Sequence, residues 1–255
     1  MDLRFNTDLI AGYHNPRQII RRLSEDWLER NVYCPNCGCT SINAFANNTK
    51  VGDFFCPHCS EQFELKSKSG LSNGKKVPDG AYVSMISRIQ AEDNPNFFFL
   101  AYKKADYSVQ QLILVPRHFV TVDMIVPRKK TLKGRENYLM CDMDISSLPK
   151  SGKILLVHQA KLVQPEQVYE QWQANLFLRQ QQSKNKGWLL AIMKCIDKLP
   201  EKFDLKQIYE FEQILSIQFP DNKHIKDKIR QQLQILRDQG VIEFSARGQY
   251  RKSKL

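Results

Sequence analysis

The sequence lacks the features of a membrane protein and of an exported protein. No apolar stretch approaches the roughly 20 residues that a membrane-spanning helix needs, although 42% of the residues are hydrophobic. The N-terminal segment MDLRFNTDLIAGYHNP has no basic start followed by an apolar core, so it does not resemble an export signal. No internal repeat is apparent. The sequence therefore predicts a cytoplasmic protein without a membrane partner.

Acidic residues are too few to balance the basic ones. The chain of 255 residues has 38 Lys and Arg against 27 Asp and Glu, a net charge of +11. A surplus of this size indicates a polyanionic partner, and on charge alone DNA, RNA and anionic membrane surfaces all qualify. The length is sufficient for one substantial domain and one small domain, each with its own core.

A disulfide framework is not expected, because cytosolic proteins keep their cysteines reduced. Of the seven cysteines, four form two C-x-x-C pairs that are separated by 18 residues: Cys34, Cys37, Cys56 and Cys59. This spacing is typical of a structural Zn²⁺ site made of four thiolates, which leaves no open position for water. His58, inside the second pair, is an alternative ligand. We therefore predict a zinc knuckle at residues 34–59, in which the metal ion stabilises the fold and takes no part in catalysis.

Two acidic residues and a lysine flank the second cysteine pair. Asp53 precedes it by three residues, and Glu64 and Lys66 follow on an expected strand, where alternation places them on one face. Two carboxylates can bind Mg²⁺ for phosphodiester hydrolysis, and Lys66 can orient the attacking water or stabilise negative charge. The alternative is a solvated strand face. Glu25 or Glu29 of the first helix could add a further carboxylate or could be simple helix surface.

The first part of the chain has the pattern of a mixed α/β domain. The apolar periodicity predicts helices over 17–31 and 80–93, the second capped by Asp79. Short aromatic or β-branched runs predict strands at 62–68, 97–102, 111–115, 120–125 and 153–157. The polar stretch 179–187 is interpreted as a linker. The predicted fold of residues 1–183 is a mixed α/β sheet domain with an inserted zinc knuckle.

The remaining part, residues 184–255, has the pattern of a winged helix. It combines 15 Lys and Arg with 9 Asp and Glu. The expected elements are helices over 188–198, 205–219 and 224–239, and a hairpin that pairs 241–244 with 249–252.

The third of these helices would bury Ile225, Ile229, Leu233 and Leu236 and expose a polar face. On that face, Arg can bond guanine and Gln can bond adenine. The hairpin adds side chains that could hold the phosphate backbone. The candidate DNA-binding residues are Lys226, Arg230, Gln231, Gln234, Arg247, Tyr250, Arg251 and Lys252. A winged helix that binds protein is the alternative.

Four sequence blocks are distinctive: YCPNCG, DFFCPHCSEQFELKSK, NPNFFFL and HIKDKIRQQLQILRD. Together they resemble one enzyme family, the DpnI-type methyl-directed restriction endonucleases. The resemblance implies a PD-(D/E)xK nuclease with a C-terminal winged helix that cleaves double-stranded DNA at GATC sites carrying N6-methyladenine. It also implies Mg²⁺ for catalysis, Zn²⁺ for structure, and catalytic roles for Asp53, Glu64 and Lys66.

The sequence departs from the family pattern at two places. Gly52 stands where the broader nuclease motif has proline, and the segment 128–138 matches poorly. The family has an aromatic residue shortly before a strand that the segment 141–145 resembles, and Tyr138 occupies that place. We expect Tyr138 to stack against the modified base or to wedge beside it, with less stacking area than tryptophan would offer.

Two other functions stay open at this point. One is a zinc and winged-helix DNA-binding regulator without nuclease activity; the other is a PD-(D/E)xK nuclease that is indifferent to methylation. A monomer is expected.

Overall fold

A computed structural model describes residues 1–46, 52–129, 134 and 138–253. The chain forms two compact units. The first contains Met1–Ser146 and Gly152–Trp172, and the second contains Ser147–Ser151 and Gln173–Leu255. The domain boundary expected after residue 183 stays a prediction. Within the described ranges, no helix is long and apolar enough to span a membrane.

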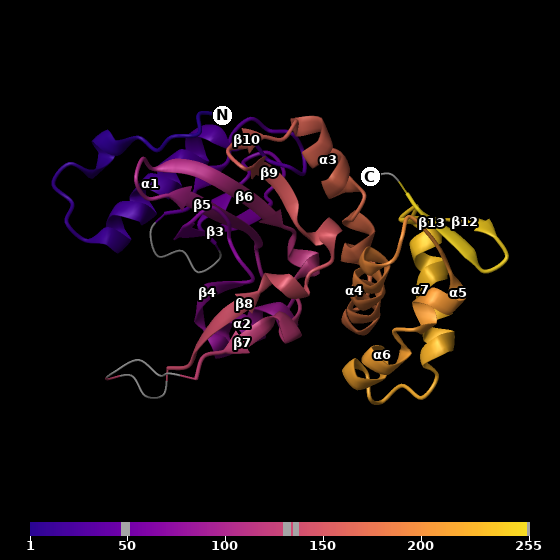
Figure 1. The fold of residues 1–255 in the computed structure, drawn as a ribbon. Helices are drawn as coiled ribbons and strands as arrows, with labels where there is room; N and C mark the ends of the chain where they lie inside the picture. The colour runs from indigo at the N-terminus through magenta and orange to yellow at the C-terminus, as the bar shows by residue number, and fades with distance from the viewer. Residues whose placement is uncertain (47–51, 130–133, 135–137, 254–255) are drawn as a thin grey trace. The chain divides into compact units, whose positions relative to one another are not determined.

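The core of the first unit is a mixed sheet. Among the described residues its strand order is β1-β2-β3-β5-β6-β9-β10. The strands are β1 (Asn43–Ala44), β2 (Phe54–Phe55), β3 (Gln62–Ser69), β5 (Asn96–Lys103), β6 (Ser108–Val115), β9 (Ile154–His158) and β10 (Lys161–Leu162). Figure 1 traces β3, β5, β6 and β9 side by side. Strand β5 is buried over Asn96–Tyr102 because it is covered on both faces, which explains its continuous apolar run.

Strand β3 runs parallel to β5, with Glu64 opposite Phe97 and Lys66 opposite Phe99. Helix α1 (Pro16–Asn31) confirms the predicted first helix. It begins where the Asn15 side chain accepts a hydrogen bond from the Arg17 amide at 2.9 Å. The helix buries an apolar stripe that includes Leu23, Trp27 and Leu28. One end of β3 is held in place because β3 pairs with the buried strand β5 on one side and with the hairpin arm β2 on the other.

A second sheet of the first unit has the order β4-β8-β7 among the described residues. It contains β4 (Lys76–Ala81), β7 (Ile125–Pro127) and β8 (Met140–Asp144), and helix α2 (Tyr82–Gln90) follows β4 directly. Two sequence predictions were wrong here. Asp79 does not cap a helix, since it lies in β4 and the helix begins later. The segment 120–125 is mostly a 3₁₀ turn, η3 (Val122–Met124), and not a strand.

Short helices complete the connections. They are η1 (Thr7–Ile10), η2 (Arg117–Phe119), η4 (Ile145–Ser147), η5 (Lys150–Gly152), α3 (Pro165–Gln173) and η6 (Leu176–Gln180).

The second unit contains a winged helix. Its elements are α4 (Ser183–Lys198), β11 (Lys202–Asp204), α5 (Leu205–Tyr209), α6 (Glu212–Gln218), α7 (Ile225–Asp238), β12 (Ile242–Ala246) and β13 (Gln249–Lys252). The strands form the sheet β11-β13-β12. The long helix expected over 205–219 is divided in two at Glu210–Phe211. The expected linker 179–187 is largely helical, because η6 and α4 extend into it.

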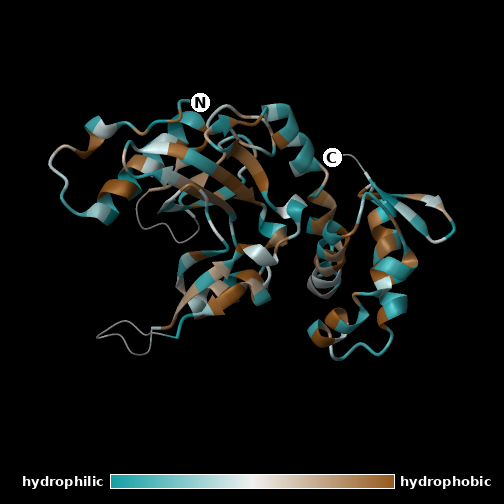
Figure 2. Cartoon of the chain, in the orientation of Figure 1, coloured by the Kyte–Doolittle hydropathy of each residue, from teal (hydrophilic) through white to brown (hydrophobic). Residues whose placement is uncertain are grey.

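Helix α7 has the predicted buried stripe. Ile225, Ile229, Leu233 and Leu236 are all buried. Figure 2 shows polar and apolar residues alternating along this helix, as expected of one apolar face and one solvent face. The expected mixed α/β core followed by a winged helix is therefore confirmed.

A substitution at Gly152 tests how tightly the core of the first unit is packed. A Cβ atom at this position would lie 2.8 Å from the Cδ1 atom of the Phe119 ring, and Phe119 is fully buried. We expect Gly152→Ala to destabilise the protein by about 1–3 kcal/mol, because the ring cannot move without overpacking. Thermal unfolding measures this change.

Gly187→Ala is the matched control in helix α4. A Cβ atom there would meet only the Phe219 ring edge at 3.9 Å, an ordinary contact. Alanine should stabilise this helix by about 0.5–1 kcal/mol relative to glycine. Equal unfolding temperatures of Gly152→Ala and the parent protein would contradict the close packing of position 152 against Phe119.

Candidate functional site

The two cysteine pairs form the same turn twice. The Gly38 amide donates to the Cys34 carbonyl at 2.9 Å, and the Ser60 amide donates to the Cys56 carbonyl at 2.9 Å. Both turns end in a left-handed residue, Gly38 with φ 74° and Ser60 with φ 59°. Each turn therefore directs two cysteine side chains to the same point, as knuckles of metal sites do.

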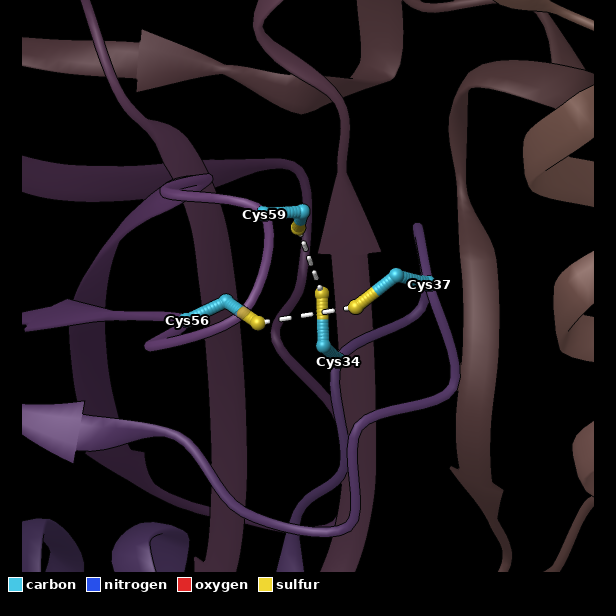
Figure 3. Close-up of side chains that lie close together, drawn as sticks. All are labelled: Cys34, Cys37, Cys56 and Cys59. Atoms are coloured by element: carbon cyan, nitrogen blue, oxygen red, sulfur yellow. Dashed lines mark hydrogen bonds between the residues drawn. The ribbon is translucent and has the colours of Figure 1, made fainter.

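The four sulfur atoms meet in a closed cluster. All lie within 4.8 Å of one another, with Cys34 Sγ 3.5 Å from Cys59 Sγ and Cys37 Sγ 3.6 Å from Cys56 Sγ (Figure 3). A tetrahedral zinc ion with bonds of about 2.3 Å would separate its sulfur ligands by about 3.8 Å. The cluster therefore fits such an ion. Among the described residues it is the only group of three or more potential ligands at this spacing, and it does not include His58.

The burial of this cluster makes a cation favourable. Burial raises the pKa of the Cys34 thiol well above its usual range, and it raises the pKa of Cys56 to about 11. Buried thiolates therefore need an opposite charge to be stable. A dication would supply that charge and keep all four sulfurs deprotonated.

The second cysteine pair lies in the turn between β2 and β3. These strands pair with Phe54 opposite Phe63. The two arms therefore continue into Asp53 on one side and Glu64 on the other. The Asp53 amide donates to the Phe63 carbonyl at 2.9 Å. The chain approaches so closely that a Cβ atom on Gly52 would lie 3.0 Å from the same carbonyl, which explains glycine at this position.

The hairpin brings the expected motif together. The Leu65 amide donates to Asp53 Oδ2 at 2.8 Å, so the Asp53 carboxylate lies against the backbone of the Glu64-Leu65-Lys66 segment. Burial raises the pKa of Asp53, although the Leu65 amide and Lys66 partly offset this effect. Lys66 Nζ lies 2.5 Å from Glu64 Oε1, as their common strand face predicts.

Two residues of the site were missed by the sequence reasoning. Asp79 in β4 accepts a hydrogen bond from Lys66 Nζ at 2.5 Å, and Arg88 of α2 lies 3.6 Å from Glu64 Oε2. Neither belongs to a local motif around the cysteines. The sequence signal at Asp79 was interpreted as a helix cap, because a single acidic residue before an amphipathic segment has that appearance.

The first helix places Glu25 beside the site. Glu25 interacts electrostatically with Asp53 and contributes to raising its pKa, and it forms an ion pair with Arg21 at 2.7 Å. The other alternative, Glu29, accepts a hydrogen bond from the Ala44 amide at 3.5 Å. Of the two candidates in this helix, Glu25 is the one that interacts electrostatically with Asp53.

The expected base-reading residues lie on the solvent face of α7. Arg230, Gln231 and Gln234 are exposed. Arg230 forms an ion pair with Asp227 at 2.7 Å, and Gln231 accepts a hydrogen bond from Lys228 at 2.7 Å. Lys226 is also exposed and lies 3.2 Å from Glu212. Since these ion pairs are solvent-exposed, they are weak and can exchange for DNA.

The candidate DNA-binding residues of the β12–β13 hairpin differ in their surroundings. Arg247 is exposed at the turn, and Arg251 pairs across the strands with Glu243. Tyr250 stacks against Phe203 with 5.5 Å between ring centroids. Lys252 Nζ donates to the Leu199 carbonyl at 2.6 Å. Tyr250 and Lys252 therefore hold the hairpin to the unit, whereas Arg247 is available to a partner.

Tyr138, expected to contact the modified base, is 37% exposed and lies just before β8. Most of the poorly matching segment before it, residues 130–133 and 135–137, lies outside the described residues.

An α/β unit with a four-cysteine knuckle, followed by a winged helix, is an arrangement of the kind that DNA-binding proteins have. Comparison with known families agrees. Residues 1–181 match the Dam-replacing family model of the DpnI type, and residues 184–252 match the Dam-replacing HTH domain. Because the first match covers most of the chain, the protein belongs to the Dam-replacing family. The resemblance to DpnI-type restriction enzymes is thereby confirmed.

The knuckle predicts a bound metal. We expect metal analysis of the purified protein to find one zinc ion per chain. Cys59→Ser should lose the ion and unfold at a lower temperature, because binding of structural zinc contributes directly to folding. Cys39→Ser is the control, since Cys39 follows the first cysteine pair but lies outside the sulfur cluster. Loss of zinc in both variants, or in neither, would contradict the assignment.

The different surroundings of Arg247 and Lys252 in the β12–β13 hairpin predict different roles for these two basic residues. Lys252→Met should lower the stability by about 1 kcal/mol by removing the bond to Leu199, with little effect on DNA affinity. Arg247→Ala should leave stability unchanged and should weaken binding to all DNA sequences, reducing the slope of log affinity against log salt by about 1. Fluorescence anisotropy at several salt concentrations measures both. The reverse pattern would show that the two assignments are exchanged.

Proposed function

We propose that this protein is a PD-(D/E)xK restriction endonuclease that cleaves double-stranded DNA at GATC sites carrying N6-methyladenine, by Mg²⁺-dependent hydrolysis. The observation that carries the proposal is the β2–β3 hairpin, which joins the sulfur cluster to Asp53 and Glu64-Leu65-Lys66. The family match supports a methyl-dependent restriction endonuclease. The recognition of GATC and the dependence on Mg²⁺ are the parts of the proposal that go beyond the family match.

The acidic residues fit a hard divalent cation. Asp53 and Glu64 offer carboxylate oxygens, which are the ligands that Mg²⁺ prefers. Burial raises the pKa of Asp53, so its ionised form gains from a nearby positive charge. Asp53 and Glu64 would hold the cation, which when bound polarises the scissile phosphate and lowers the pKa of the attacking water.

Lys66 would supply a fixed hydrogen-bond donor. Burial alone would lower the pKa of Lys66, but the adjacent Glu64 and Asp79 outweigh this effect and raise it. The residue therefore remains an ammonium group, which can donate to a phosphate oxygen or orient the attacking water. It also offsets the negative charge that develops on the phosphate.

Methyl recognition would come from both parts of the chain. The N6-methyl group of adenine projects into the major groove, which is the groove that admits a helix such as α7. Burial of a methyl group contributes about 0.8 kcal/mol. Tyr138 offers an exposed aromatic ring in the first unit. Two modest preferences of this kind would multiply into strong discrimination.

A plasmid digestion tests the proposal. The wild-type protein with Mg²⁺ should cleave plasmid from an adenine-methylating host and leave plasmid from a non-methylating host intact. Equal cleavage of both plasmids would indicate a nuclease that is indifferent to methylation. Binding without any Mg²⁺-dependent nicking would indicate a DNA-binding regulator.

Asp53→Asn should reduce cleavage by at least roughly a hundredfold, because it removes the charge that would hold the cation. Its affinity for a methylated duplex should stay close to that of the wild type. Asp106→Asn is the matched control, since Asp106 is an exposed turn residue bonded to Ser108. Near wild-type cleavage by Asp53→Asn would overturn the assignment of the site.

A further inference from the structure

Lys66 is held by a carboxylate from a different sheet. Lys66 Nζ lies 2.5 Å from Asp79 Oδ1, and the Asp79 side chain is only 4% exposed. Asp79 Oδ1 also accepts the Gly80 amide at 2.7 Å. The second oxygen, Oδ2, is buried and has no hydrogen-bond partner in the described part of the chain. Lys66 is thus the ion-pair partner that compensates this buried charge.

An irregularity in the β4–β8 pairing directs Asp79 to this position. Pro78 lies opposite Asp142 and Ala81 lies opposite Met140, so the residues between them, Asp79 and Gly80, face a single residue of β8. Such bulges bend a strand and redirect a side chain. Cys141 is the residue of β8 opposite this bulge, and its thiol donates to the Gly80 carbonyl at 3.6 Å.

We propose that Asp79 is a positioning residue that holds the Lys66 ammonium group in place for the cleavage step. This inference rests on the proposed nuclease function. Asp79 acts through Lys66 and is not itself a ligand of the catalytic cation. In support, Asp79 Oδ1 accepts hydrogen bonds from the Lys66 ammonium group and from the Gly80 amide.

The need for a second anchor follows from the other partner of Lys66. Glu64 Oε1 contacts Lys66 Nζ, but the same carboxylate would bind the cation. A cation would compete for Glu64 and would repel the ammonium group. A lysine side chain has many rotamers, so it would then lose its defined position. Asp79 keeps a negative charge against Lys66 on the side that belongs to the other sheet.

Asp79→Asn tests this proposal because it preserves the size of the side chain and removes its charge. We expect single-turnover cleavage of methylated plasmid to slow by about 10- to 100-fold, as is typical when a supporting partner is lost. The affinity for methylated duplex should change less than twofold. Asp79→Glu, which restores the charge, should recover part of the rate.

Asp142→Asn is the matched control. Asp142 lies opposite Pro78 on the neighbouring strand, but it pairs with Arg128 at 2.6 Å and not with Lys66. Its cleavage rate should stay close to that of the wild type. In a Lys66→Gln background, Asp79→Asn should cause no further loss, because residues that act through one another are not additive.

Each outcome decides a separate question. If the wild-type protein does not cleave DNA, the proposed nuclease function fails. If the wild type cleaves and Asp79→Asn cleaves at a similar rate, the positioning role alone is wrong. Equal losses in Asp79→Asn and Asp79→Glu, accompanied by a lower unfolding temperature in both, would assign Asp79 a merely structural role and overturn the proposal.

Discussion

The contact among four cysteine sulfurs is the constraint on which the candidate site depends. The sulfur atoms lie within 4.8 Å of one another, and they come from two turns that 18 residues separate in the sequence. The second turn closes the β2–β3 hairpin, whose arms carry Asp53 and Glu64. A small hairpin has little core of its own. A metal ion in this cluster would therefore fix the distance between the two carboxylates as well as the local fold.

The second constraint is the position of β3 between two partners. The main sheet determines which face of β3 carries Glu64 and Lys66, since β3 is paired along its length with the buried strand β5. The smaller sheet brings Asp79 to the end of the Lys66 side chain. Helix α1 adds Glu25 near Asp53. The site thus combines one local hairpin with groups from two other elements, and only the hairpin has a recognisable sequence motif.

This difference explains how much could be predicted from the sequence. The cysteine spacing and the strand alternation are local, so the knuckle and the common face of Glu64 and Lys66 were predictable. The contact of Lys66 with Asp79 depends on the bulge in β4, for which the sequence has no local signal. In the second unit, periodicity identified the buried stripe of α7, but not the inward role of Lys252, which depends on a carbonyl group 53 residues away.

A crystal structure with a methylated GATC duplex, measured at the zinc absorption edge in the presence of a divalent cation that does not support cleavage, tests the account most directly. The account predicts an anomalous zinc peak between the four sulfurs. It also predicts the second cation in contact with Asp53 and Glu64, beside the scissile phosphate, with Lys66 still bonded to Asp79. A sulfur cluster without zinc in active protein, or a phosphate and cation bound away from these carboxylates, would contradict it.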